Sequence, residues 1–236
     1  MKLYEHIDRL YDSAKAAYIE VSLSKDEFKE AIIDTLKANG FQNCHIRPWV
    51  SYGEKGGSPN VFIQARYRKT EMGKMFKTII SAVRRTACDS IDAKIKTSSR
   101  LDICLASVEA QNASVDCAIM LDKDGFLADS APGASIFIVK RNEVFTPFTT
   151  NSLESVTRGL LMELLKEEGY RVEEKNMTFK NIYSADEIFI CGTSAEIKPI
   201  VEVDGRTIGD GKMGPVTKKA IELYRNYIKK GAVPLY

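Results

Sequence analysis

The chain has 236 residues, of which 44% are hydrophobic and 28% charged, a composition typical of a globular protein with a substantial core. Its 34 basic and 32 acidic residues are spread along the chain and give a formal charge of +2, which does not indicate a nucleic-acid partner. There is no charged-then-apolar leader and no apolar run near the ~18 residues that a membrane span needs. We therefore expect a cytoplasmic protein that binds small molecules and neither nucleic acid nor membrane.

The cysteines and histidines indicate neither a disulfide framework nor a metal site. Five cysteines occur without CxxC spacing, and the chain has only two histidines. Free cysteine is usually buried, so most of these thiols are expected to be small core residues. The five are Cys44, Cys88, Cys104, Cys117 and Cys191.

The first part of the chain predicts two helices followed by three strands. Apolar residues recur at helical spacing over residues 3–18, and a second helix over 24–40 begins with Ser24 as its N-cap and ends at Gly40. Three runs rich in β-branched and aromatic residues follow, "CHIRPWVSY", "NVFIQARY" and "FKTIISAVRR". We assign residues 1–85 to a small α+β domain.

A polar bridge over residues 86–95 leads to a second, larger domain over residues 96–236. Helices are predicted over 99–112, 154–169 and 214–230, with strand-like runs between them such as "DCAIMLD", "ASIFIVK" and "ADEIFICGT". The sequence thus predicts an α+β protein of two domains. A boundary of this kind is a common place for a ligand site.

The stretch "DAKIKTSSRLDICLASVEA" places Lys94 and Lys96 where a short β-like run gives way to a helix. A lysine in such a position is most often a solvated surface residue. A nucleophilic lysine needs a neutral amine, because only the neutral form attacks a carbonyl to form a Schiff base. Composition and spacing alone leave both interpretations open.

Three motifs in a fixed order give the chain a family resemblance. They are "EHIDRL" near the start, then "ADEIFICGTSAEIKPI", then "VEVDGRTIGDGKMGPVTKK" near the end. Over essentially its whole length the sequence resembles the class IV aminotransferases, the fold-type IV pyridoxal-phosphate enzymes. That family includes branched-chain amino-acid aminotransferases, D-amino-acid aminotransferases and aminodeoxychorismate lyases. The resemblance implies a two-domain α+β fold with pyridoxal 5'-phosphate in the interdomain cleft, and usually a homodimer.

The resemblance makes Lys96 the catalytic lysine, which also binds the cofactor. In the D-amino-acid and lyase branches this lysine stands thirteen residues before the Glu of a "LAxxEA" helix, and counting back from Glu109 leads to Lys96. The branched-chain spacing of fourteen leads to Ile95, and the tyrosine of that pattern is replaced by Arg100. Lys94 is the alternative.

The resemblance also implies the other cofactor-binding residues. A phosphate dianion is suited to an arginine and to the free N–H groups of a helix N-terminus. Arg9 in "EHIDRL", Val156 and Thr157 in "LESVTRGLL", and Thr193 in "GTSAE" match the phosphate positions. Asp129 in "GFLADSAPGASIF" stands where the family has a Glu beside the pyridine nitrogen, and its side chain is shorter.

The substrate-binding positions point to two branches of the family. Arg47 and His45 in "HIRP" match the "YIRP" of branched-chain enzymes, and residues two apart on a strand share a face. Backbone amides of Ser194 and Ala195 follow the "GT" motif and would also meet the substrate carboxylate. "HIRP" favours branched-chain L-amino acids, whereas "KTSSRL" favours the D-amino-acid and lyase branches.

The leading hypothesis is therefore transamination of branched-chain L-amino acids with 2-oxoglutarate as acceptor, as in branched-chain amino-acid biosynthesis. An aminodeoxychorismate lyase or a D-amino-acid aminotransferase is the alternative. Family members carry a longer segment before "EHIDRL", so a shortened paralogue that lacks N-terminal strands and has weak or no catalysis also stays open.

Overall fold

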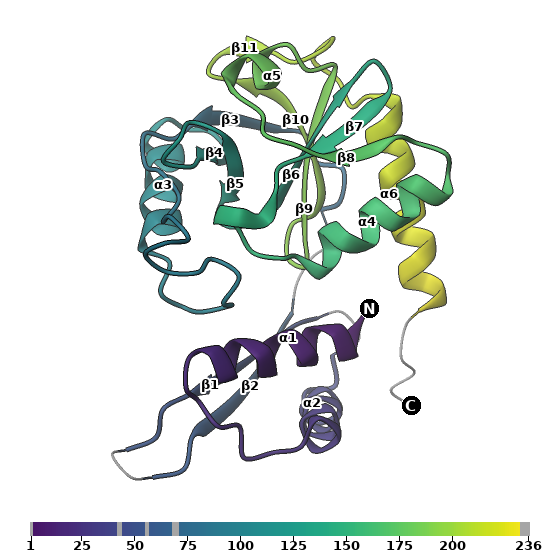
Figure 1. The fold of residues 1–236 in the computed structure, drawn as a ribbon. Coiled ribbons are helices and arrows are strands. Elements are labelled where there is room, and N and C mark those ends of the chain that lie inside the picture. The colour runs from purple at the N-terminus through teal and green to yellow at the C-terminus, as the bar shows by residue number, and fades with distance from the viewer. Residues whose placement is uncertain (1, 42–43, 55–56, 68–70, 232–236) are drawn as a thin grey trace. The chain divides into compact units, whose positions relative to one another are not determined.

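The computed structural model describes residues 2–41, 44–54, 57–67 and 71–231, and the chain forms two compact units (Figure 1). The smaller unit comprises Met1–Thr70, Ile95–Thr97 and Lys230–Tyr236, and the larger unit comprises Glu71–Lys94 and Ser98–Lys229. Each unit combines helices with a sheet, so the predicted α+β fold class is confirmed.

The smaller unit begins with the two predicted helices, α1 (Leu3–Ala16) and α2 (Lys25–Asn39). Ser24 and Glu27 form a capping box at the start of α2, in which each side chain satisfies a backbone N–H of the other residue. Gly40 ends α2 with φ 61°, a left-handed conformation that glycine adopts without strain.

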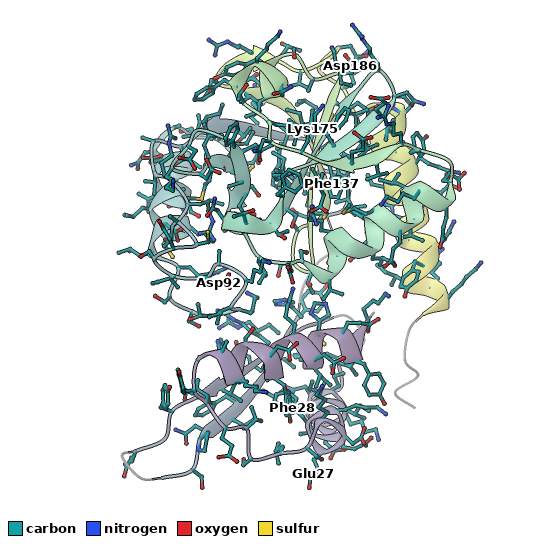
Figure 2. The ribbon with its side chains drawn as sticks, viewed as in Figure 1. Glu27, Phe28, Asp92, Phe137, Lys175 and Asp186 are labelled. Atoms are coloured by element: carbon teal, nitrogen blue, oxygen red, sulfur yellow. The ribbon has the colours of Figure 1, made fainter. Side chains whose placement is uncertain are left out.

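Strands β1 (Cys44–Ser51) and β2 (Asn60–Tyr67) pair antiparallel in the smaller unit. Side chains alternate between the faces of a strand, and one face carries Cys44, Ile46 and Val50 into a cluster with helix α2. Phe28 is fully buried at the centre of that cluster and is labelled in Figure 2. Helices and sheet thus share one small apolar core.

Strand β3 (Phe76–Ile80) belongs to the larger unit, which differs from the predicted boundary at residue 85. It lies between β4 (Cys117–Leu121) and β10 (Glu196–Val203) and pairs parallel with both. The β-propensity of a run predicts a strand but not its partner, and these partners lie far away in sequence. The expected linker, 86–95, likewise belongs to the larger unit except for its last residue.

The larger unit is built on a nine-stranded mixed sheet with the order β5-β4-β3-β10-β9-β6-β7-β8, and β11 pairs with β10 (Figure 1). The remaining strands are β5 (Leu127–Ala131), β6 (Ser135–Lys140), β7 (Glu143–Thr146), β8 (Val172–Glu174), β9 (Glu187–Gly192) and β11 (Arg206–Thr207).

Helices pack on different strands of this sheet: α3 lies against β4 and β5, and α4 lies against β8 and β9 (Figure 1). They are α3 (Leu101–Asn112), η1 (Thr149–Asn151), α4 (Val156–Glu167), α5 (Phe179–Tyr183) and α6 (Pro215–Lys230). The sequence predicted α3, α4 and α6 but not the short α5. Among the residues that the structure describes, no helix is both long and apolar enough to span a membrane.

Strand β4 is buried on both faces, so its sequence is continuously apolar. Ala118 and Met120 pack against α3, whereas the alternate residues Cys117, Ile119 and Leu121 enter the main core. On β6 and β9, Phe137 and Phe189 face each other across the strands and stack with their ring centroids 4.9 Å apart (Phe137 in Figure 2). Alternation therefore supplies two packed layers from one sheet.

Glu187 at the start of β9 caps the N-terminus of α6. Its carboxylate accepts hydrogen bonds from the Val216 N–H at 3.0 Å, the Thr217 N–H at 2.8 Å and the Thr217 hydroxyl at 2.6 Å. A Cβ on Gly214 would lie 2.1 Å from the Glu187 carboxyl carbon, so glycine is required there. These bonds satisfy amides that a helix leaves unpaired.

The cysteines are less buried than predicted. Cys117 and Cys191 are buried and Cys44 is half-buried, but Cys88 and Cys104 are exposed. The prediction of a core position was therefore wrong for the last two. Cys88 stands beside Asp89 and Ser90, and Cys104 lies on α3 outside the face that buries Ile103, Ala106 and Ala110.

Candidate active site

The two candidate lysines differ in their contacts. The Lys94 ammonium pairs with the Glu154 carboxylate at 3.0 Å, and this hydrogen bond raises the pKa of Lys94. Lys96 lies in the smaller unit, where its backbone N–H donates to the Ser13 hydroxyl of α1 at 3.0 Å and its side chain is exposed. Because the nucleophile is the neutral amine, the ion pair makes Lys94 the poorer candidate.

Arg9 lies one helical turn after His6 on α1, and Arg9 Nη2 is 3.3 Å from His6 Nδ1. Burial, and then the charge of Arg9, lowers the pKa of His6 to about 4, with a smaller contribution from Lys96. His6 is therefore neutral near pH 7 and can accept from Arg9 at Nδ1. Burial also lowers the pKa of Arg9. The smaller unit thus gathers Arg9, His6 and Lys96 within electrostatic reach of one another.

His6 was not identified from the sequence. Its signal is the spacing of three residues from Arg9 within "EHIDRL", which places the two side chains side by side on a helix. With Nδ1 as acceptor, the ring hydrogen is on Nε2, and that atom is buried with no hydrogen-bond partner among the residues the structure describes.

Arg47 and His45 lie on β1, on the face opposite to Cys44 and Ile46. Because side chains alternate along β1, His45 and Arg47 share one face of the strand, as the sequence predicted. The exposed Arg47 guanidinium stacks over the Trp49 ring, 4.5 Å from its centroid.

Asp129 lies on β5 and is 6% exposed. Its Oδ1 accepts from the Ser130 N–H at 2.9 Å, and its Oδ2 is 3.9 Å from Arg85 Nε. Burial raises the pKa of Asp129 to about 6, although Arg85, the Ser130 amide and Arg100 act in the opposite direction. The carboxyl is thus held close to the point where it gains or loses its proton near neutral pH.

The N-terminus of α4 carries Val156 and Thr157, as predicted, with Ser155 as the cap. The Ser155 hydroxyl accepts from the Arg158 N–H at 3.3 Å. Thr157 is buried, and in the part of the chain that the structure describes its hydroxyl has no partner in hydrogen-bond geometry. A helix N-terminus with such a hydroxyl is suited to an anion.

The Tyr224 hydroxyl of α6 lies close enough to the Thr157 hydroxyl to interact with it. Burial raises the pKa of Tyr224, and Thr157 acts in the opposite direction. The two hydroxyls therefore interact, although their geometry falls short of a hydrogen bond.

Thr193, Ser194 and Ala195 form the turn between β9 and β10. Thr193 is exposed, and its two successors are half-buried. The turn begins after Gly192, where an added Cβ would contact Ala134 at 3.7 Å. This turn therefore lies beside the one that joins β5 to β6.

The surroundings of Cys191 show which predicted residues of the larger unit lie together. Burial raises the pKa of this thiol, Arg158 lowers it and Asp129 raises it. Asp129 of β5 and Arg158 of α4 thus both lie close to Cys191, near the end of β9. Thr193 is the first residue after that strand. Asp129, Thr157 and Thr193 accordingly belong to one region of the larger unit.

These residues fit a phosphorylated pyridine cofactor. The Thr157 hydroxyl and the N–H groups of the first turn of α4 can receive phosphate oxygens, and the buried Asp129 carboxyl can face a ring nitrogen. In the smaller unit, Arg9 and Lys96 supply a guanidinium and an amine.

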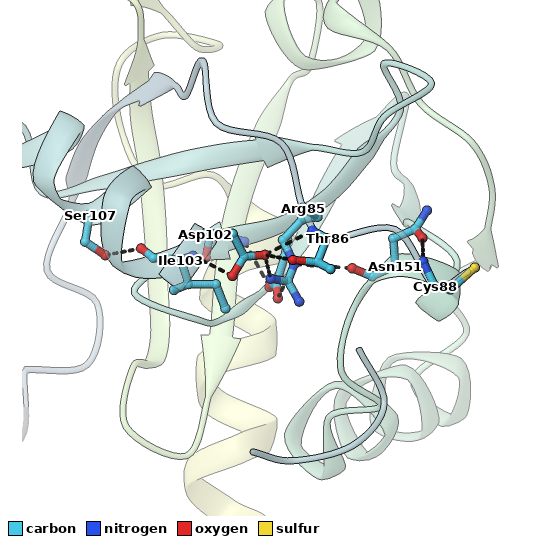
Figure 3. Close-up of polar contacts among 9 residues, drawn as sticks. Arg85, Thr86, Cys88, Asp102, Ile103, Ser107 and Asn151 are labelled. Atoms are coloured by element: carbon cyan, nitrogen blue, oxygen red, sulfur yellow. Dashed lines mark hydrogen bonds and ion pairs between the residues drawn. The ribbon is translucent and has the colours of Figure 1, made fainter. Parts of the chain in front are cut away.

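Sequence reasoning missed the groups that surround Asp129. Arg85 follows β3 and pairs with Asp102 in the first turn of α3 (Figure 3). Arg85 stands in the "RR" pair of "SAVRRT", and its partners Asp102 and Asp129 are far from it in the sequence. Two adjacent arginines show no periodicity that would reveal which of them is buried.

Comparisons with known proteins show which family the chain resembles. The family model for amino-transferase class IV matches residues 1–203. The chain is 35% identical to a branched-chain-amino-acid aminotransferase of Pseudomonas aeruginosa over 94% of this chain and 76% of that protein. It is 37% identical to branched-chain-amino-acid aminotransferase-like protein 2 of Arabidopsis thaliana over 99% of this chain, but it spans only 44% of that relative.

A solved structure shows the same fold. The branched-chain amino acid aminotransferase from Thermobaculum terrenum, in its PLP-form, matches with a TM-score of 0.91 and 29% identity. The match covers 98% of this chain and 79% of that chain.

The chain belongs to the class IV aminotransferases, an enzyme family whose cofactor is pyridoxal 5'-phosphate. Within that family it is similar to the branched-chain amino-acid aminotransferases, in sequence and in fold.

Proposed function

We propose that the protein binds pyridoxal 5'-phosphate and transfers the amino group of branched-chain L-amino acids to 2-oxoglutarate. Similarity to branched-chain enzymes supports the donor class. The observation that carries the chemistry is the buried Asp129 carboxyl on β5, which is suited to holding a pyridine ring protonated. The acceptor rests on the family pattern.

Lys96 is the proposed catalytic residue. Its Nζ would hold the cofactor and, when free, would move the substrate α-proton as general base and then general acid. When bound, the cofactor supplies an electron sink for the α-carbon. The ion pair between Lys94 and Glu154, at 3.0 Å, counts against the alternative lysine.

Four residues are proposed to bind the phosphate. Val156 and Thr157 contribute backbone amides at the start of α4, Thr157 and Thr193 contribute hydroxyls, and Arg9 contributes a guanidinium. The contact with His6 orients the Arg9 guanidinium, and a neutral ring does not cancel its charge, which suits Arg9 to a dianion.

The substrate carboxylate is proposed to bind Arg47, with the amides of Ser194 and Ala195. Arg47 is exposed and lies over the Trp49 ring, which limits its rotamers. His45, on the same face of β1, is proposed as a polar neighbour of the substrate.

The test is reconstitution of the purified chain with pyridoxal 5'-phosphate, followed by borohydride reduction and peptide mapping. The label is expected on Lys96, and glutamate is expected from 2-oxoglutarate with L-leucine, L-isoleucine or L-valine as donor. A label on Lys94, or absence of turnover with all three donors, would contradict the proposal.

Arg100 at the branched-chain tyrosine position favours a second candidate, a D-amino-acid aminotransferase or an aminodeoxychorismate lyase. Turnover of D-alanine would indicate the first, and pyruvate release from aminodeoxychorismate without an acceptor the second. Cofactor binding with no turnover of any of these would indicate a paralogue without catalysis.

A cytoplasmic homodimer is proposed from the family pattern. Light scattering of the chromatographed protein at several concentrations checks the dimer, and cell fractionation checks the location. A monomer that turns over leucine would contradict the oligomeric part alone.

A further inference from the structure

Three charged side chains lie around the carboxyl of Asp129 in the larger unit. Arg85 lies in the segment after β3, and Arg100 and Asp102 lie at the start of α3, while Asp129 itself lies on β5. Arg85 is 8% exposed and Asp129 is 6% exposed. Buried charges are tolerated only where opposite charges and hydrogen bonds compensate for lost water, so each contact here has an energetic consequence.

Arg85 is fixed by both its backbone and its side chain. Its backbone N–H donates to the Leu121 carbonyl at 2.9 Å, which ties the segment to β4. Its Nε donates to the Asn151 carbonyl at 3.2 Å, while its Nη1 pairs with Asp102 Oδ2 (Figure 3). The contact with Asp129 is longer, at 3.9 Å, and is not a hydrogen bond.

Asp102 is the stronger partner of Arg85 because the chain keeps it ionised. Burial acts to raise its pKa, but amide hydrogen bonds from Thr86 and Ile103 and the charge of Arg85 lower it overall. The Thr86 N–H and hydroxyl lie 3.0 and 3.1 Å from Oδ2, and the Ile103 N–H lies 2.8 Å from Oδ1 (Figure 3). These contacts fix the carboxylate, and through it the guanidinium.

Arg100 approaches Asp129 from another direction. Its Nη1 lies 3.0 Å from the position that a Cβ on Gly133 would occupy, so it packs against the turn that follows β5. Gly133 has φ 106°, which suits glycine, and the absent side chain leaves room for the guanidinium. Arg100 also lowers the pKa of Asp129, which places the two groups within electrostatic reach.

Two other titratable groups lie near this cluster. The Cys191 thiol on β9 is buried, and burial raises its pKa, so it stays neutral. Asp122 accepts a hydrogen bond from the Asn151 side-chain amide at 3.2 Å, whereas Arg85 binds the backbone carbonyl of Asn151. The charges that face Asp129 directly are therefore those of Arg85, Arg100 and Asp102.

We propose that Asp102 and Arg85 are positioning residues for Asp129: Asp102 holds the Arg85 guanidinium beside the Asp129 carboxyl, and the pair sets how firmly Asp129 binds its proton. A carboxylate paired tightly with arginine is a weak proton acceptor, and one buried without a cation keeps its own proton. The long contact gives an intermediate affinity, suited to a pyridine nitrogen. This last part rests on the proposed function.

The test is a carbon-13 NMR titration of aspartate carboxyl carbons in the cofactor-free protein, with Asp129 assigned from the Asp129→Asn variant. Asp102→Asn removes a like charge and frees Arg85 to turn toward Asp129. The Asp129 pKa is then expected to fall by about one unit or more, a tenfold change in proton affinity. Arg85→Gln removes the cation, and the same pKa is expected to rise by a similar amount.

The matched control is Glu109→Gln. Glu109 also ties α3 to the segment after β3, since it accepts from the Ser81 hydroxyl at 2.5 Å and the Ala82 N–H at 3.0 Å, but it is not among the groups that shift Asp129. This variant is expected to lower the melting temperature and leave the Asp129 titration in place. Asp102→Glu, which keeps the charge, is expected to restore most of the wild-type titration.

A purely structural role for Asp102 would give a different pattern. Asp102→Asn and Glu109→Gln would then both lower the melting temperature while the Asp129 midpoint stayed unchanged, and that result would overturn the inference. If one of the two charge variants fails to fold, the other decides, because their expected shifts have opposite signs.

The titration separates this inference from the proposed function. It uses the cofactor-free chain, so a shifted Asp129 midpoint supports the positioning role even if pyridoxal 5'-phosphate labels no lysine. An unchanged midpoint in a chain that transaminates leucine would overturn the inference and leave the function intact.

Discussion

The charged groups around Arg9 in the smaller unit and those around Asp129 in the larger unit are held in different ways. Arg9 and His6 lie half-buried on one helix, and their mutual contact at 3.3 Å joins a cation to a neutral ring. Asp129, Arg85, Arg100 and Asp102 come from three separate segments, and their two carboxyls lie among two guanidiniums. The larger unit thus surrounds its titrating carboxyl with its own charges, whereas the smaller unit is suited to offering positive charge to an anion.

The largest expected effect concerns the lysine of the smaller unit. Lys96→Ala is expected to reduce transamination by about 10³-fold or more, because it removes the covalent attachment point and the proton carrier together. The measurement is kcat with L-leucine and 2-oxoglutarate at saturating cofactor. Lys94→Ala is the matched control and should keep activity within a few-fold. Equal losses in both variants would reverse the assignment.

Next in size is the cap of α6 in the larger unit. Glu187→Ala removes three hydrogen bonds and leaves the buried Val216 and Thr217 amides unpaired, so we expect a loss of roughly 2–4 kcal/mol in the free energy of unfolding. Urea denaturation followed by circular dichroism measures it.

The control for that variant is the exposed neighbour Asp186, which pairs with Lys140 at 2.7 Å. Asp186→Ala should cost less than about 1 kcal/mol, because water replaces an exposed ion pair. If Asp186→Ala lowered the free energy of unfolding as much as Glu187→Ala, the buried hydrogen bonds of Glu187 would not be what stabilises the larger unit.

A pH-dependent effect is expected from His6 in the smaller unit. Its folded-state pKa of about 4 lies below the unfolded value of 6.5, so the unfolded chain binds more protons between these values. His6 therefore contributes stability that is present above pH 6.5 and is lost as the pH falls toward 4, by roughly 3 kcal/mol in all. His6→Gln should flatten this dependence.

Trp49 provides the readout, since it is the single tryptophan and lies in the smaller unit. Urea titrations by its fluorescence at about pH 7.5 and about pH 4.5, which span most of the His6 transition, compare the two proteins. If the wild type and His6→Gln lose the same stability between these pH values, His6 is not the group responsible. The neutral ring of His6 would then not be what distinguishes the smaller unit from the larger.

The smallest effect is expected at the exposed capping box of α2. Ser24→Ala removes the acceptor for the Glu27 N–H and is expected to cost about 1 kcal/mol, whereas Ser24→Asp should retain the cap. Trp49 fluorescence again reports the unfolding. A loss above about 2 kcal/mol in the free energy of unfolding would show that this helix cap contributes more to the stability of the smaller unit than an exposed cap usually does.

Local signals allowed the helices of both units to be predicted. Ser24 and Gly40 mark the ends of α2, and the apolar spacing marks α4 and α6, because caps and periodicity are properties of neighbouring residues. The place of β3 was not predictable in the same way, since its partners are defined by pairing across the sheet.

The site shows the same division between local and distant information. Family motifs led to Asp129 and Lys96, and their roles stay predictions. They could not lead to Arg85 beside Asp129, because a buried ion pair between residues 44 positions apart leaves no periodic trace. Similarly, the exposure of Cys88 and Cys104 depends on how whole segments pack.

The residues Ile95–Thr97 belong to the smaller unit, although the stretch before them, Glu71–Lys94, lies in the larger unit. A recombination event after residue 70 would transfer the helices and hairpin of the smaller unit but leave Lys96 behind, separated from the Ser13 hydroxyl that holds its backbone. The smaller unit with its lysine is thus encoded by separate stretches of the gene, and a single cut cannot divide it from the larger unit.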